Sequence, residues 1–287
     1  MAMTIKGLHQ TFFKTHLVIW KAAGLCVALS LASCSSVPLT ESGALTSYGS
    51  LGASEGRFSK SRSYVDTPAL LAATTVAISS TRLSPQASSS IHNTGDGRLV
   101  SNALDRALCI GLSDRYNIVG PGEPADITVK AVITDIVPTG KFAAGLSTAV
   151  SLGSSVVLPV GVPRLPIGLG GLAVEAEALD KDGMQRAAIV WSRGANSITN
   201  QARVSEVGDA YGLASAFAGQ FAEMLVKGKN TSGLHVSLPS RQKLRSQLGG
   251  APKNAACEAY GRAPGVSGLA LSLLGTPPSW SDSGPKL

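Results

Sequence analysis

Hydrophobic and polar residues alternate along three stretches in the middle of this 287-residue chain. Residues 126–137 carry apolar side chains at positions 127, 129, 131 and 133, with Thr128, Lys130 and Thr134 between them. Residues 172–179 alternate in the same way, and Asp180–Gly183 forms a turn into a third stretch at 184–191. A strand with this period buries one face and exposes the other. The pattern therefore predicts three strands, the last two joined as a hairpin.

Two further stretches repeat their apolar residues with the 3.6-residue period of a helix. The first spans 96–114 with Asp96 as its N-cap, and the second spans 205–227 with Ser205 as its N-cap. Runs of β-branched residues predict shorter strands at 75–83 and 116–119. This order predicts an α+β fold over residues 67–227, a two-layer sandwich in which two helices cover one face of an antiparallel or mixed sheet.

The first 33 residues have the pattern of a secretory leader. Three lysines precede the apolar run 22–32, which is too short to cross a bilayer. The run ends in Leu31, Ala32, Ser33 and Cys34, which resemble a bacterial lipobox. That resemblance implies cleavage before Cys34 and lipidation of its thiol, and Ser35 favours the outer membrane. Several acyl chains on one residue would make the attachment effectively permanent.

The two flanks of the folded region look unlike it. Residues 34–66 are rich in serine and glycine and are expected to form a lipidated tether. Residues 228–287 lack a sustained period and are expected to be a disordered basic tail. The net charge of +7 comes from the leader and this tail, because residues 34–227 hold 15 Lys and Arg against 16 Asp and Glu. A basic face on the folded region is therefore missing, which argues against nucleic-acid binding.

One segment, 142–163, carries no charge over 22 residues. Three readings remain open for it: a buried crossover or Gly/Ser loop, an element that touches a membrane or a partner, and a transmembrane span. Its glycines, its serines and the pair Pro159 and Pro163 oppose a span. Exposed apolar surface on a monomer usually marks an interface, which supports the second reading.

Residue types that carry enzymatic chemistry are sparse. Outside the leader the only histidines are His92 and His235, and neither has ligands at metal-binding spacing, so we expect no metal and no cofactor. No nucleophile elbow is present, and the glycines of 120–125 belong to a proline-containing turn and not to a dinucleotide loop. We therefore expect that the protein is not an enzyme.

Two small clusters remain as candidate sites. Glu175 and Glu177 share one strand face, and Asp135 can approach them from a neighbouring strand. Such carboxylates serve acid/base chemistry or hold a cation, or they simply form a solvated face with Lys130 as a charge partner. Cys109 and Cys257 can pair as a disulfide in an oxidising periplasm, the alternative being a buried free thiol at Cys109.

Several short motifs resemble a known family. They are 42–51 and 64–66 after the lipobox, 133–139 at a strand end, 174–180 at the acidic hairpin and 207–210 at the start of the last helix. In order and spacing they resemble the bacterial lipoproteins grouped as Domain of Unknown Function 3313, over about residues 34–227. The resemblance implies a secreted lipoprotein with an α+β domain, and it implies no activity.

Together these features predict an outer-membrane lipoprotein that faces the periplasm. Its expected role is that of a non-enzymatic, lipid-tethered adaptor or a structural component of an envelope assembly, with an envelope protein as partner. The alternative is a small-ligand-binding or hydrolytic lipoprotein with a cleft beside 142–163. A third reading is contact with the cell wall through the basic tail.

Overall fold

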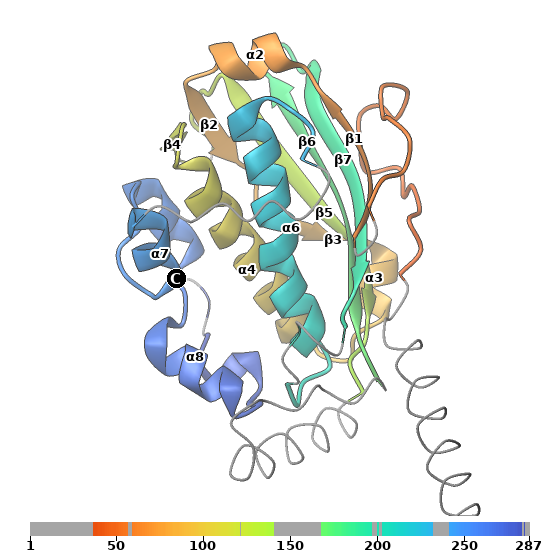
Figure 1. Cartoon of the computed structure of the whole chain (residues 1–287), viewed down its shortest axis with the longest axis vertical. Helices are drawn as coiled ribbons and strands as arrows, with labels where there is room; N and C mark the ends of the chain where they lie inside the picture. Colours follow the sequence, from red (N-terminus) through yellow and green to blue (C-terminus); the bar gives the residue numbers. More distant parts are fainter. Residues whose placement is uncertain are drawn as a thin grey trace, which may run out of the picture.

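A computed structural model describes residues 37–56, 59–120, 122–140, 168–196, 200, 203–231, 241–282 and 284. In these residues seven strands form one mixed sheet (Figure 1). Its order is β1 (Lys60–Val65), β7 (Gln185–Gly194), β6 (Gly171–Asp180), β5 (Ile127–Val137), β2 (Thr75–Ile78) and β4 (Asn117–Val119), with β3 (Arg82–Leu83) beside β5. The pairs among β1, β7, β6 and β5 are antiparallel, whereas β2, β3 and β4 pair in parallel.

Two long helices, α4 (Thr94–Leu112) and α6 (Gly208–Lys227), lie side by side on one face of the sheet (Figure 1). The apolar stripe of each helix packs on the inward residues of β5, β6 and β7 and forms the main core. Trp191 on β7 meets Phe217 on α6 edge to face, with ring centroids 5.4 Å apart. The short helices α2 (Thr67–Ala72) and α3 (Pro85–Ser89) connect the strands around this core.

The predicted α+β class with a mixed sheet is confirmed, and each of the predicted strands and helices begins within three residues of its predicted position. The strand predicted at 75–83 is divided into β2 and β3. Between them the backbone leaves the sheet, and Thr81 N–H donates a hydrogen bond to the Asp105 carboxylate of α4. The N-caps also differ from prediction. Asn93 caps α4, and α6 begins after Val207 without a side-chain cap.

The expectation of a tether over 34–66 is wrong for its described part. Residues 60–65 form β1, an edge strand antiparallel to β7, and Val37, Leu45 and Leu51 are buried. This segment covers the sheet face opposite to α4 and α6, where Leu45 and Leu51 pack on Ala188 and Val190 of β7. The sheet is therefore covered on both faces along β6 and β7, which a simple two-layer sandwich does not describe.

The expectation of a disordered tail is also wrong for the described residues. They form α7 (Arg241–Gln247), the 3₁₀ turn η1 (Ala255–Tyr260), α8 (Gly265–Leu273) and the 3₁₀ turn η2 (Pro278–Trp280). This C-terminal lobe, residues 241–284, packs against α4, and its η1 also contacts β4 at the edge of the sheet (Figure 1). The leader, Cys34 with its lipobox, the segment 142–163 and His235 lie outside the described residues.

Candidate functional site

The two glutamates of the predicted acidic face bind the N-terminal segment of the chain. Glu175 accepts hydrogen bonds from Ser42 N–H at 2.6 Å and Ala44 N–H at 3.0 Å. Glu177 accepts from Thr46 N–H at 2.8 Å and from its hydroxyl at 3.0 Å. The donors are spaced two residues apart, as expected where an extended backbone aims alternate N–H groups at one surface. We call these residues the carboxylate clamp.

Burial of both carboxylates explains why the clamp needs so many donors. Glu175 is 1% exposed and Glu177 is 4% exposed. A buried carboxylate is costly unless hydrogen bonds replace its lost water, and bonds to an ionised acceptor are the strong ones. Tyr48 supplies one more, donating its hydroxyl to Glu175 at 2.5 Å. Burial and this bond raise the pKa of Tyr48, so the phenol stays protonated and remains a donor.

The clamp decides between the roles expected for these carboxylates. Their oxygens are occupied by backbone and side-chain donors, so neither the solvated face nor an open acid/base pair describes them. Lys130 faces Glu177 in the strand register and is exposed. Asp135 lies on β5 opposite Ala173, on the same sheet face, and takes no part in the clamp. Alternation located the glutamates, but the chain that covers them comes from about 130 residues away.

The clamped segment begins beside the start of β6. The Val37 carbonyl accepts a bond from the Ser192 hydroxyl at 3.1 Å, and Val37 itself is 3% exposed. Gly171 makes room for it, because a Cβ at that position would overlap a Val37 methyl group. The first described residue is therefore fixed to the sheet.

Asp209, a residue that sequence analysis gave no role, ties the same end of the sheet together. It is 2% exposed, and its carboxylate accepts from Gly170 N–H at 2.7 Å and from the Thr139 hydroxyl at 3.1 Å. Gly140 N–H donates to the Gly168 carbonyl at 2.9 Å. The two residues that flank segment 141–167 are therefore adjacent. The motif 207–210 contained this residue, but its spacing alone did not show the contact.

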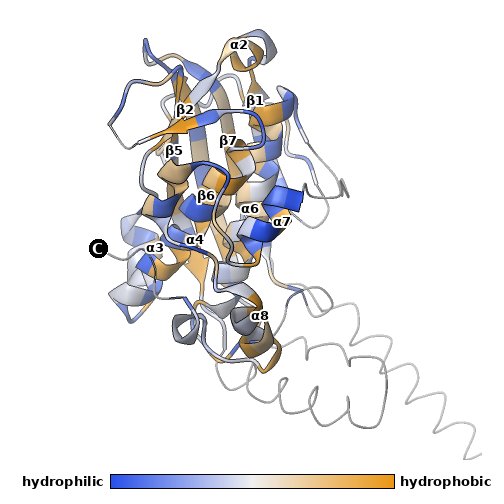
Figure 2. Cartoon of the chain, turned by 90° about the vertical axis from the view of Figure 1, so that its left-hand side faces the viewer, coloured by the Kyte–Doolittle hydropathy of each residue, from blue (hydrophilic) through white to orange (hydrophobic). Residues whose placement is uncertain are grey.

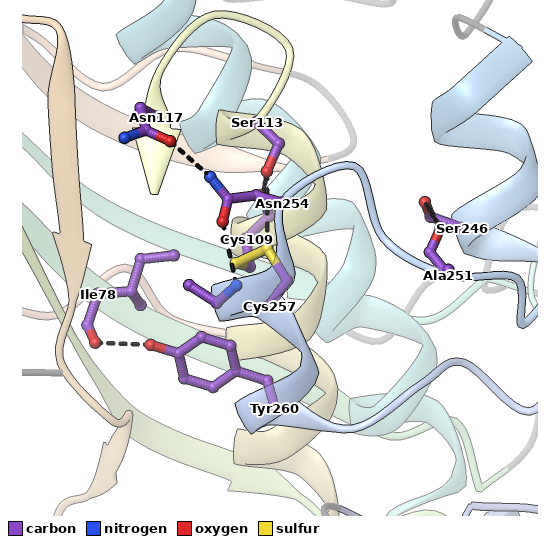
Figure 3. The surroundings of a disulfide bond; sticks show 10 residues. Ile78, Cys109, Ser113, Asn117, Ser246, Ala251, Asn254, Cys257 and Tyr260 are labelled. Atoms are coloured by element: carbon purple, nitrogen blue, oxygen red, sulfur yellow. Dashed lines mark hydrogen bonds between the residues drawn. A yellow bond between two sulfur atoms is a disulfide. The ribbon is translucent and has the colours of Figure 1, made fainter. Parts of the chain in front are cut away.

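A disulfide between Cys109 on α4 and Cys257 in η1 attaches the C-terminal lobe, and this is the pair that the sequence suggested (Figure 3). Beside it, the Tyr260 hydroxyl donates to the Ile78 carbonyl at 2.8 Å, and the Lys253 ammonium group donates to the Ser113 carbonyl at 2.7 Å. A crosslink of this kind restricts the unfolded chain and so favours the attached state. The lobe is thus part of the folded unit.

A buried ion pair fixes the end of the lobe. The Arg106 guanidinium on α4 pairs with Asp282, which also accepts the Tyr211 hydroxyl at 2.6 Å. Burial alone would raise the pKa of the Asp282 carboxyl. The hydrogen bonds and positive charge of Arg106, together with the hydrogen bond from Tyr211, outweigh burial and hold this pKa below its usual value. Removing either partner would leave an uncompensated buried charge, which is strongly destabilising.

Helix α8 has the reverse of the usual surface pattern. Gly268 and Ser272 are buried, whereas several large apolar side chains are exposed. Figure 2 colours part of this helix as hydrophobic. The outward residues are Val266, Leu269, Leu273 and Leu274, which are 50–67% exposed, and nearby Trp280, which is 71% exposed. We call these five residues the α8 face. Large apolar side chains with this exposure are candidates for contact with a membrane or a partner.

The described chain shows no metal site and no spanning helix. Within the described ranges, no three His, Cys, Asp or Glu residues lie together in a way that could hold a metal ion. His92 lies 2.6 Å from Glu206, Nδ1 to Oε1, in a single pair. None of the described helices combines the length and hydropathy that crossing a bilayer requires.

These features define a mixed α+β domain whose sheet is covered by its own N-terminal segment. The chain belongs to the family described as "Protein of unknown function (DUF3313)", whose model matches residues 40–221. That range includes the carboxylate clamp and ends before the C-terminal lobe. A search of curated proteins gave no match.

Among solved structures the chain is similar to PelC dodecamers from Paraburkholderia phytofirmans. One shares 11% identity at a TM-score of 0.35, and a PelC variant shares 10% at 0.33. Each match covers 60% of this chain and 99% of the PelC chain.

Proposed function

We propose that this protein is a non-enzymatic lipoprotein of the outer membrane, anchored through Cys34 and facing the periplasm. Its role is that of an adaptor or structural component of an envelope assembly. The carboxylate clamp is the observation that carries this proposal. Its hydrogen bonds occupy Glu175 and Glu177, the strongest candidates for catalytic residues. It also fixes the segment that follows the lipobox to the folded domain.

The clamp also sets how far the domain stands from the lipid. Cys34 precedes the buried Val37 by three residues. A fully extended chain advances about 3.5 Å per residue, so the distance from Cys34 to Val37 is about 10 Å at most. A lipid on Cys34 would hold the domain against the membrane surface instead of at the end of a long flexible linker.

The α8 face supports the same placement. Val204 N–H donates to the Gly275 carbonyl, which brings the end of α8 close to the first turn of α6. Val37 and Gly171 lie at that same end of the sheet, where Gly170 bonds to Asp209 of α6. Exposed apolar side chains are typical of surfaces that insert into the headgroup region. In this proposal the α8 face rests on the bilayer.

The anchor is tested by the mass of the mature N-terminus and by extraction from membranes. We expect an acylated Cys34 and release only by detergent, and we expect Cys34→Ala to abolish both. An unmodified Cys34 in the membrane fraction, or release of the native protein by salt alone, would refute the proposal.

Membrane contact of the α8 face has a natural reporter. Without the leader, Trp191 and Trp280 are the only tryptophans, and Trp191 is 1% exposed. The protein is reconstituted in vesicles of phosphatidylethanolamine and phosphatidylglycerol whose acyl chains carry bromine. We expect bromine to quench Trp280, and Leu269→Asp with Leu273→Asp to reduce the quenching. Equal quenching in the wild-type protein and this variant would exclude the contact.

A further inference from the structure

A cavity of about 320 Å³ lies between the helices of the main domain and the C-terminal lobe. Helices α4 and α6 form one wall, α7 and α8 form the other, and Arg203 and Ser281 contribute from adjoining loops. This volume falls at the lower end of the range of small-molecule sites in proteins. The cavity is separate from the carboxylate clamp, which lies across the sheet.

The charged groups around the cavity are unequal in number. Its described lining includes Arg106, Arg203 and Lys243 and contains no acidic residue. Asp282 pairs with Arg106, and the Lys243 ammonium group lies 3.5 Å from the Asp114 carboxylate. Arg203 is therefore the surplus cation.

Arg203 contacts the ring of Tyr211, and the Asp282 carboxylate that pairs with Arg106 also acts on its charge. The guanidinium carbon of Arg203 lies 5.2 Å from the centroid of the Tyr211 ring, at the distance of a cation–π contact. Burial lowers the pKa of Arg203, although the Tyr211 hydroxyl and the Asp282 carboxylate act in the opposite direction. A guanidinium with free donors in a partly dry cavity is suited to a carboxylate or phosphate group.

Part of the remaining lining is apolar, and Ser215, Gln247 and Ser272 add polar groups. Ala103, Ala107 and Ile110 of α4 form one side, and Leu248 and Leu269 form the opposite rim. Both leucines are partly exposed, at 41% and 50%, so the apolar side of the cavity opens toward the α8 face. An acyl chain would bury its surface against these residues at a gain of about 25 cal/mol per Å².

We propose that this cavity binds a small single-tailed anionic amphiphile, with its anionic head at Arg203 and its acyl chain along α4 and Leu269. The shared chemistry is one carboxylate or phosphate on a short chain, as in a free fatty acid or an alkyl phosphate. This site is independent of the lipid anchor.

Two glycines of α6 offer a matched pair of variants. A Cβ at Gly219 meets nothing within 4 Å, and Gly219 lines the cavity, so the side chain of Gly219→Leu should occupy part of the site. A Cβ at Gly212 also meets nothing within 4 Å, but Gly212 does not line the cavity. Both changes replace glycine in a helix, which raises helix propensity equally. Gly212→Leu is therefore the control.

The experiment uses the full chain in a neutral detergent and counts bound decanoate or decyl phosphate by native mass spectrometry. We expect one ligand per chain, with decanol binding at least tenfold more weakly. Arg203→Gln should weaken decanoate binding at least tenfold, which corresponds to about 1.4 kcal/mol, and Gly219→Leu should abolish it. Gly212→Leu and the exposed charge control Arg98→Gln should bind like the wild-type protein.

Two outcomes would overturn the proposal. Wild-type affinity in Gly219→Leu would place the ligand elsewhere, and equal binding of decanol and decanoate would remove the role of Arg203. If Arg203→Gln fails to fold, Gly219→Leu still decides the question. Preference for decyl phosphate over decanoate, or the reverse, identifies which head group the site selects.

Discussion

Replacing Glu175 with glutamine tests the carboxylate clamp most directly. The change keeps the shape of the side chain but replaces one acceptor oxygen with an amide that donates hydrogen bonds. Three donors now point at Glu175, from Ser42, Ala44 and Tyr48. At least one of them would face the new amide donor and lose its bond.

The size of the effect follows from the charges involved. A hydrogen bond to an ionised group contributes about 1.5–3 kcal/mol, and a buried donor left unpaired costs about 1–3 kcal/mol. We take about 3 kcal/mol as the loss of local stability. Because 1.4 kcal/mol corresponds to a factor of ten, the clamped segment should open about 100-fold more often.

Native-state hydrogen exchange measures this opening residue by residue. We expect the amides of Ser42 and Ala44 to exchange about 100-fold faster in Glu175→Gln, while amides in α4 and α6 keep their wild-type rates. The core on the opposite face does not depend on the clamp. Glu223→Gln, which removes a surface carboxylate paired with Lys227, is the control. Unchanged exchange at Ser42 and Ala44 in Glu175→Gln would refute the clamp.

Three other predictions concern stability. Replacing Cys109 and Cys257 with serine opens a loop of 148 residues, and the chain-entropy model limits the loss of unfolding free energy to about 5 kcal/mol. Limited proteolysis of this variant should cut the C-terminal lobe first, and a lobe that stays intact would contradict the prediction. Burial raises the pKa of Asp105 to about 6 despite bonds from Thr81. The native state therefore binds more protons than the unfolded state near pH 5, so the wild-type protein should gain about 1 kcal/mol relative to Asp105→Asn between pH 7 and pH 5 in denaturant titrations. Gly171→Ala should displace Val37 and speed exchange at Ser42, whereas Gly183→Ala, strained but distant, should leave that amide unchanged.

The central sheet and the long helices could be predicted because their signals are local. Residues 127–137 alternate over a full strand, and the apolar stripe of 208–227 continues for more than five turns. Strand β1 was missed because its sequence, Lys-Ser-Arg-Ser-Tyr-Val, is largely polar and lies in a serine-rich stretch. Its order comes from pairing with β7 and not from its own composition.

The order of the C-terminal lobe and the covering of the glutamates could not be predicted from local pattern, because both depend on contacts distant in sequence. Cys257 binds 148 residues back, and Asp282 binds Arg106. Helix α8 also misleads a pattern-based reading, since Gly268 and Ser272 are buried while Leu269 and Leu273 are exposed. The candidate acidic residues were located correctly, but their covering by residues 42–48 could be seen only in three dimensions.

The position of the disulfide has a consequence for damaged chains. A premature stop just before codon 257 would leave the sheet and both long helices complete. It would remove most of η1 and all of α8 and η2 from the C-terminal lobe that packs against α4. Such a product would leave Cys109 as an unpaired thiol, and in the periplasm proposed for this protein that thiol could form a disulfide with a second truncated molecule. Loss of the last thirty-odd residues would therefore allow covalent coupling between chains instead of merely shortening the protein.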